Sequence, residues 1–173
     1  MKVEVLPADE ADRPIVDNLL QLYLHDFSEF DGSRLGADGR FEYPYLSQYW
    51  AKSDRHPFLI RAERELAGFA LVKKGSEIAG DTEAMDVAEF FVLRSQRRKG
   101  IGRKAFHQIL HTFPGSWVVR VLDGIPDALA FWDRVIPEAA DGPITKEETA
   151  GGERDWIVFR FAAPRASIYD SSA

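Results

Sequence analysis

Hydrophobic positions along the chain follow two periods, which predict that strands and helices succeed one another. Apolar residues spaced three or four apart predict amphipathic helices, whereas short apolar or alternating runs predict strands. The helical spacing occurs at 15–27, 101–110 and 126–136. The segments that predict strands are 2–6, 58–62, 66–72, 85–93, 117–122, 145–149 and 156–161.

The stretches between these elements are short. The aromatic-rich segment 41–50 fits either a loop or a second short helix, and Gly151-Gly152 predicts a turn before the last strand. No internal repeat or linker divides the chain. We therefore expect one domain over residues 1–163, followed by a small polar tail at 164–173.

Composition places the chain among ordinary globular proteins. It has 173 residues, of which 45% are hydrophobic and 29% are charged, and it contains no cysteine. Without cysteine it can form neither disulfides nor thiolate metal sites. Its first residues lack the apolar core of a signal peptide, and no stretch approaches the length of a membrane-spanning helix. These features predict a cytoplasmic protein without a membrane partner.

One basic segment interrupts an acidic chain. The formal net charge is −6, yet Arg94–Lys104 holds six cations and no acid. Most such runs are solvated surface. A compact basic segment on an acidic protein also suits one small anionic ligand, whereas a nucleic acid needs a more extended basic surface. We therefore expect no nucleic-acid partner.

Glycines inside the basic segment favour the anion site. The order is an apolar strand, the loop RSQRRKGIG and then a helix. A helix N-terminus leaves backbone N–H groups unpaired, and glycine lets a ligand approach the backbone closely. The loop lacks both the G-x-G-x-x-G pattern of dinucleotide sites and the G-x-x-x-x-G-K-[ST] pattern of P-loops. The sequence therefore predicts a phosphate site that neither of these two motifs describes.

The run RRKGIG at 97–102 matches the pattern R/Q-x-x-G-x-G/A. After an apolar strand, this run resembles the coenzyme A pyrophosphate loop of the GNAT N-acetyltransferase superfamily. The run ALAFW at 128–132 is similar to the A-x-x-F-Y pattern in a later helix of that superfamily. The order of elements is also similar from Lys2 to Phe161, so the resemblance covers nearly the whole chain.

The resemblance implies a fold and a reaction. The fold is α+β (α/β three-layer), with a mixed, mostly antiparallel twisted sheet of about seven strands and helices on both faces. The reaction is acetyl transfer from acetyl-CoA to a primary amine of a small-molecule acceptor, by direct attack in a ternary complex. No metal is implied.

The resemblance also implies which residues hold the cofactor. The loop amides would bind the pyrophosphate, and the end of the preceding strand would pair with the pantetheine arm and bind the thioester oxygen. These cofactor residues are Phe91, Val92, Leu93, Arg97, Arg98, Lys99, Gly100, Ile101, Gly102, Arg103, Lys104, Phe131 and Trp132.

Two acids in the strand before the loop are candidates for the catalytic base. An alkylamine is mostly protonated at neutral pH, so some group must accept its proton. Asp86 falls where many superfamily members carry their base, and Glu89 lies deepest in the apolar run. A regular strand places them on opposite faces, Asp86 with Ala88 and Glu89 with Phe91. Each also fits the simpler role of an ion-pair partner.

The chain departs from the superfamily pattern at Trp132. A tyrosine is common there and can protonate the leaving thiolate, whereas an indole is only a hydrogen-bond donor. The asparagine that is common before that helix is also missing, since the chain reads Gly124-Ile125-Pro126. Two functions therefore stay open: an active N-acetyltransferase, or a catalytically silent acyl-CoA-binding sensor or regulatory module.

Acids and aromatic rings in the first third of the chain suit a cationic acceptor. Asp26, Glu29 and Tyr45 are the predicted acceptor residues, although such side chains are more often solvated or part of a core. His107 and His111 have a metal-compatible spacing, but no third ligand is evident, and we expect no metal. The acceptor's identity, the acyl chain and a possible homodimer stay open.

Overall fold

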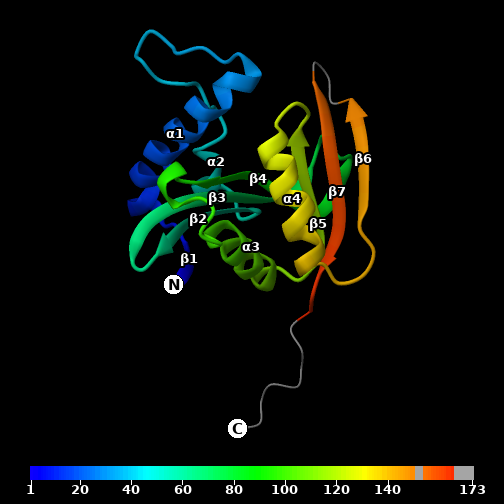
Figure 1. Cartoon of the computed structure of the whole chain (residues 1–173). Coiled ribbons are helices and arrows are strands. Elements are labelled where there is room, and N and C mark those ends of the chain that lie inside the picture. The colour runs from blue at the N-terminus through cyan, green and yellow to red at the C-terminus, as the bar shows by residue number, and fades with distance from the viewer. Residues whose placement is uncertain (151–153, 166–173) are drawn as a thin grey trace. The chain divides into compact units, whose positions relative to one another are not determined.

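The computed structural model describes residues 1–150 and 154–165. Its strands are β1 (Val3–Pro7), β2 (Arg55–Ala62), β3 (Glu65–Ser76), β4 (Asp81–Val92), β5 (Gly115–Leu122), β6 (Thr145–Ala150) and β7 (Asp155–Ala163). Its α-helices are α1 (Arg13–Asp31), α2 (Gln48–Ala51), α3 (Ile101–Thr112) and α4 (Pro126–Ala139). The strands form one sheet in the order β1-β2-β3-β4-β5-β7-β6 (Figure 1). The predicted α+β fold with a seven-stranded mixed sheet is confirmed.

The residues divide into two compact units, and the first combines β1 and β2 with α1 and α2. Unit 1 comprises Met1–Lys73 and Val87–Gly102. β1 pairs antiparallel with β2, and β2 pairs antiparallel with β3. Helix α1 ends at Asp31 and is capped by Gly32, whose φ of 69° is left-handed and whose N–H donates to the carbonyl of Ser28. The buried core of this unit consists of Ala8, Val16, Leu19, Leu20, Leu46, Tyr49, Leu59, Phe69, Leu71 and Phe91.

The second unit carries α4, β5, β6 and β7. Unit 2 comprises Lys74–Asp86 and the residues from Arg103 onward. β7 pairs antiparallel with both β5 and β6. Phe106 of α3 lies in edge contact with Trp132 of α4 and with Phe161 of β7, at centroid distances of 5.0 and 6.2 Å. The apolar stripes of α3 and α4 therefore pack on each other and on the sheet of this unit.

The sequence pattern predicts nearly every helix and strand of the structure, and the predicted and observed elements differ mainly in where they begin and end. β3 continues four residues past the predicted strand 66–72, to Ser76, and β4 begins four residues before the predicted strand 85–93, at Asp81. Segment 41–50 holds the start of a single helical turn, α2. The predicted turn at Gly151-Gly152 and most of the predicted tail, 166–173, lie outside the described residues.

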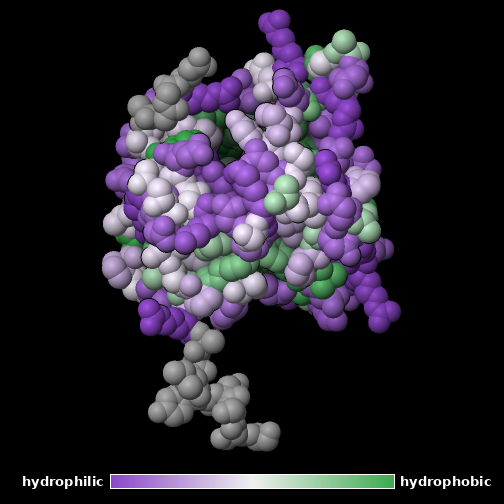
Figure 2. Space-filling view, turned by 180° about the vertical axis from the view of Figure 1, so that it is seen from behind, coloured by the Kyte–Doolittle hydropathy of each residue, from purple (hydrophilic) through white to green (hydrophobic). Residues whose placement is uncertain are grey.

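The surface of the protein carries mainly hydrophilic residues. Figure 2 shows a mainly hydrophilic face on which hydrophobic residues form small areas. Among the described residues, no helix combines the length and the apolar composition that crossing a bilayer requires.

Candidate functional site

The loop after β4 contains two residues with left-handed backbone conformation. A 3-10 turn at Arg94–Gln96 follows the strand, and α3 begins at Ile101. Between them Arg98 and Gly100 have left-handed φ values of 62° and 77°. A left-handed residue other than glycine is disfavoured, so Arg98 marks a constrained position. A loop of this kind directly before a helix N-terminus can direct backbone N–H groups toward an anion.

The end of β4 lies unusually close to β3. Leu93 donates its N–H to the carbonyl of Ala67 at 2.8 Å. A Cβ added to Gly68 would overlap the carbonyl oxygen of Phe91 and lie 3.0 Å from its carbonyl carbon. Glycine is thus required at residue 68 for this approach. Because backbone groups alternate between the two edges of a strand, Val92 directs its own toward the edge opposite β3.

The predicted alternation along β4 is wrong at Ala88. That residue packs against the same core as Phe91 and Leu93, although it was expected on the opposite face. The period of two is therefore interrupted between Ala88 and Phe91, near the place where the Phe91 carbonyl approaches Gly68.

Arg97, the first residue of the RRKGIG run, is fixed at three points. Its Nε donates to the carbonyl of Val92 at 2.9 Å, and its terminal nitrogen donates to Asp26 at 2.8 Å. Its guanidinium also lies over the Phe91 ring, 5.6 Å from the centroid. Burial of Asp26 opposes its ionisation, but hydrogen bonds from Arg94 and Arg97 outweigh that penalty and lower the pKa of Asp26. The Asp26 carboxylate, a predicted acceptor residue, is therefore occupied by two arginines.

Glu89 is paired with a tyrosine from the segment before α2. The hydroxyl of Tyr43 donates to Oε1 of Glu89 at 3.0 Å. Burial, together with the charge of Glu89, raises the pKa of Tyr43 far above its usual value, so the phenol stays neutral. Tyr45 packs edge-on against Tyr43 at 5.8 Å and is 55% exposed, whereas Glu29 is exposed on α1.

Asp86 is buried in unit 2 and pairs with an arginine. Its carboxylate is 0% exposed and accepts from Arg120 Nε at 2.9 and 3.1 Å. Arg120 also lies over the ring of Trp156, 5.5 Å from its centroid. A buried charge that loses its partner is costly, so this contact favours a structural role for Asp86.

Four of the predicted cofactor residues, Arg103, Lys104, Phe131 and Trp132, lie in unit 2. Trp132 is 7% exposed and packs between Phe106 and Phe131, which makes it part of the core. Phe131 is half-buried, and Arg103 pairs with Glu138 at 3.2 Å. Lys104 is exposed on α3. In the part of the chain that the structure describes, no group of three metal-ligating side chains is assembled, so His107 and His111 stay without a third ligand.

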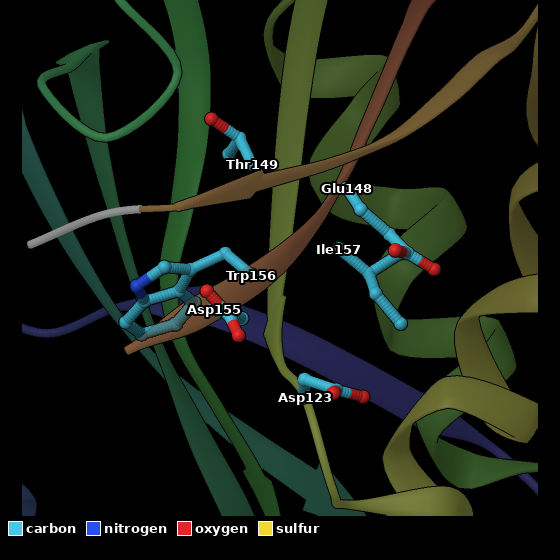
Figure 3. A pocket seen from close by; sticks show the side chains of 6 residues that line it. All are labelled: Asp123, Glu148, Thr149, Asp155, Trp156 and Ile157. Atoms are coloured by element: carbon cyan, nitrogen blue, oxygen red, sulfur yellow. The ribbon is translucent and has the colours of Figure 1, made fainter. Parts of the chain in front are cut away.

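A pocket of about 240 Å³ lies at the β6–β7 hairpin of unit 2, and none of its lining residues is a predicted site residue. It is lined by Asp123, Glu148, Thr149, Asp155, Trp156 and Ile157. Figure 3 shows that Glu148 and Ile157 point to one side of the hairpin and that Thr149 and Trp156 point to the other. This pattern follows from the register, which pairs Glu148 with Ile157 and Thr149 with Trp156.

Comparison with known proteins decides the family. A model described as the acetyltransferase (GNAT) family matches residues 16–134. The chain belongs to the GNAT acetyltransferase family. The matched range includes the strand before the loop, the RRKGIG run and the ALAFW run. The predicted enzyme class, an acetyl-CoA-dependent acyltransferase, is thereby confirmed.

Solved structures show the same fold at low sequence identity. An acetyltransferase from Thermus thermophilus is 16% identical, with a TM-score of 0.65 over 94% of this chain and 97% of that one. Spermidine N-acetyltransferase from Vibrio cholerae, solved with CoA and spermine, is 12% identical, with a TM-score of 0.62 over 93% and 95%. No curated protein matches this GNAT chain in sequence.

Proposed function

We propose that this GNAT enzyme transfers the acetyl group of acetyl-CoA to a primary amine of a small acceptor. The neutral amine nitrogen attacks the thioester carbonyl carbon, the carbon–nitrogen bond forms, and the carbon–sulfur bond breaks. The nitrogen loses a proton to a carboxylate, directly or through water, and the coenzyme A thiolate leaves. Both substrates are bound together, so proximity supplies much of the rate.

Features of unit 1 support the binding of acetyl-CoA, the acetyl donor. The left-handed backbone at Arg98 and Gly100 places a run of N–H groups and cations directly before a helix N-terminus. Such a backbone suits the pyrophosphate of acetyl-CoA. The edge of β4 that faces away from β3 carries Val92, whose N–H we assign to the pantetheine arm or the thioester oxygen. Arg103, Lys104, Phe131 and Trp132 stay sequence-based predictions for the cofactor.

We assign the proton acceptor to Glu89. Its side chain is half-buried at the same strand end as Val92, and a neutral tyrosine donates to one of its oxygens. A carboxylate in this position can take a proton from the attacking amine. Asp86 is the weaker candidate, because its carboxylate is fully buried and bound to Arg120.

For the acceptor we retain Glu29 and Tyr45. Both are exposed residues of unit 1, and carboxylates and aromatic rings are each side chains that attract an ammonium group. Asp26 fits this role less well, because two arginines already occupy its carboxylate. A pairing with a small cationic amine agrees with the acidic net charge of −6.

A thermal melt with acetyl-CoA, coenzyme A, NAD and ATP tests the donor site. A ligand at 100 times its dissociation constant adds about 2.7 kcal/mol, which raises Tm by roughly 5–10 °C in a chain of this size. We expect both CoA forms to raise Tm, and NAD to leave it unchanged. No change with either CoA form at millimolar concentration would refute the donor site.

A thiol-release assay against a panel of amines tests the transfer. Glu89→Gln is the matched variant, since it keeps the size of the side chain and removes its basicity. We expect it to retain the Tm increase with acetyl-CoA and to lower kcat by about 10²–10⁴-fold. A CoA-dependent Tm increase without thiol release for any amine would instead indicate the catalytically silent module.

A further inference from the structure

Asp26 of α1 binds two arginines, Arg94 and Arg97, in the loop that we assign to acetyl-CoA, the acetyl donor. Arg94 donates through Nε to the two carboxylate oxygens at 3.0 and 3.1 Å, and its terminal nitrogen lies 2.9 Å from Oδ1. Arg97 donates to Oδ2 at 2.8 Å. Arg94 lies in the turn after β4, and Arg97 opens the RRKGIG run. One carboxylate therefore holds the segment at two positions three residues apart.

The same arginine joins this carboxylate to the end of β4. While its terminal nitrogen binds Asp26, Nε of Arg97 binds the Val92 carbonyl at 2.9 Å, and its guanidinium covers the Phe91 ring. A planar guanidinium can serve two acceptors at once in a fixed geometry, which an ammonium cannot do. Through Asp26 and Arg97, helix α1 thus fixes the first residue of the loop against the strand end that precedes it.

We propose that Asp26 is a positioning residue for the acetyl-CoA site. It acts through Arg97, holding the loop that binds the pyrophosphate at a set distance from the strand end that binds the pantetheine and thioester. The inference rests on the proposed donor site and adds a residue to it. It also gives α1 a function in donor binding that its amphipathic pattern does not reveal.

Two effects of Asp26 on acetyl-CoA binding have opposite signs. Its negative charge repels the pyrophosphate, so removing that charge should tighten binding if charge alone matters. Its hydrogen bonds order two flexible arginines in advance, so removing them should weaken binding if preorganisation dominates. The short, charge-assisted contacts favour preorganisation, since such hydrogen bonds are about twice as strong as neutral ones. The sign of the change in affinity therefore decides between the two.

The test compares acetyl-CoA affinity in Asp26→Asn and in a matched control. Asp17→Asn likewise removes a carboxylate of α1 that pairs with an arginine, because Asp17 binds Arg40 at 2.6 Å. Neither Asp17 nor Arg40 belongs to the donor site. Isothermal titration with acetyl-CoA is measured for wild type, both variants, Asp26→Glu and Arg97→Lys. Tm without ligand is measured for each, so that loss of folding is recognised.

We expect Asp26→Asn to raise Kd for acetyl-CoA by about tenfold or more, a factor that corresponds to roughly 1.4 kcal/mol. With an amine that supports thiol release, KM for acetyl-CoA should rise while kcat changes little. Asp17→Asn should bind like wild type, and Asp26→Glu should recover part of the loss because it restores the carboxylate. Arg97→Lys should also weaken binding, although it keeps the charge.

Unchanged or tighter binding by a folded Asp26→Asn protein would overturn the inference while leaving the proposed function in place. If Asp26→Asn does not fold, Arg97→Lys decides, since wild-type affinity in that variant would overturn the inference equally. Absence of binding by wild type would refute the donor site itself, and with it the role of Asp26. A merely structural aspartate would lower Tm and leave the KM of the folded enzyme unchanged.

Discussion

Replacing Gly68 by alanine tests whether the end of β4 depends on the bare backbone of β3. The added Cβ would overlap the Phe91 carbonyl oxygen and lie 3.0 Å from the Phe91 carbonyl carbon and 3.1 Å from Val92 Cα. All of these atoms belong to backbone, so no side chain can rotate away. β4 must therefore move, and it carries the residues that we assign to the pantetheine arm.

The size of the movement follows from van der Waals distances. Carbon atoms pack best at about 3.5–4.0 Å, so the Phe91 carbonyl carbon alone must retreat by roughly 0.5–1 Å. Overpacking of this kind costs about 1–3 kcal/mol, and the lower backbone entropy of alanine in the unfolded chain returns about 0.4–1 kcal/mol. The net loss is about 1–2 kcal/mol, which lowers Tm by roughly 2–8 °C. A displacement of this size near a reacting group can reduce the rate about 10²-fold.

The assay pairs Tm with acetyl-CoA affinity and thiol release. Gly39→Ala is the control, because Gly39 has a left-handed φ of 75° and nothing within 4 Å of an added Cβ. That variant should lose about 1–2 kcal/mol from backbone strain and keep its affinity for acetyl-CoA. Wild-type Tm and affinity in Gly68→Ala would show that the close approach of the two strands is not needed.

Three further outcomes follow from the ion pairs and hydrogen bonds. Tyr43→Phe removes the hydroxyl that donates to Glu89 Oε1 at 3.0 Å, so kcat should fall by about tenfold while the increase of Tm with acetyl-CoA is kept; an unchanged kcat would show that Tyr43 does not assist the base. Arg120→Ala leaves Asp86 buried without that partner and should lower the free energy of unfolding in urea by about 3–5 kcal/mol, whereas a loss below about 1 kcal/mol would contradict a buried pair. Because arginines lower the pKa of Asp26 below 3.8, its stabilising contribution should be complete above that value and disappear as pH falls through the lowered pKa. Tm measured against pH in wild type and in Asp26→Asn checks this. If Tm falls equally in both proteins as pH is lowered, Asp26 does not make this contribution.

The sequence predicted the elements well because their signals are local. The spacing of Leu19 and Leu22 on α1, and the apolar run before Leu93, are readable without any knowledge of contacts. The extra length of β3 and β4 was missed because Gly75 and Gly80 read as loop residues. In the structure β3 continues past Gly75, and the turn is confined to the residues before Asp81.

The site was harder to predict because its decisive contacts join residues far apart in the chain. Tyr43 and Glu89 are 46 residues apart, and Arg97 and Asp26 are 71 apart. An acid on α1 looks the same in sequence whether it faces an amine or an arginine, so Asp26 was assigned to the acceptor. Gly68 gave no signal at all, since a glycine within a strand does not reveal what approaches it.

The interleaving of the two compact units governs how this chain can be divided. Neither unit is a continuous piece of sequence, because the chain passes from one to the other within β3, within β4 and again after Gly102. A fragment that ends at Gly102 would keep Asp86 and lose Arg120. No single cut releases either unit intact, so gene truncation, domain fusion at an internal site, or transfer of one half to another protein would each disrupt both units at once.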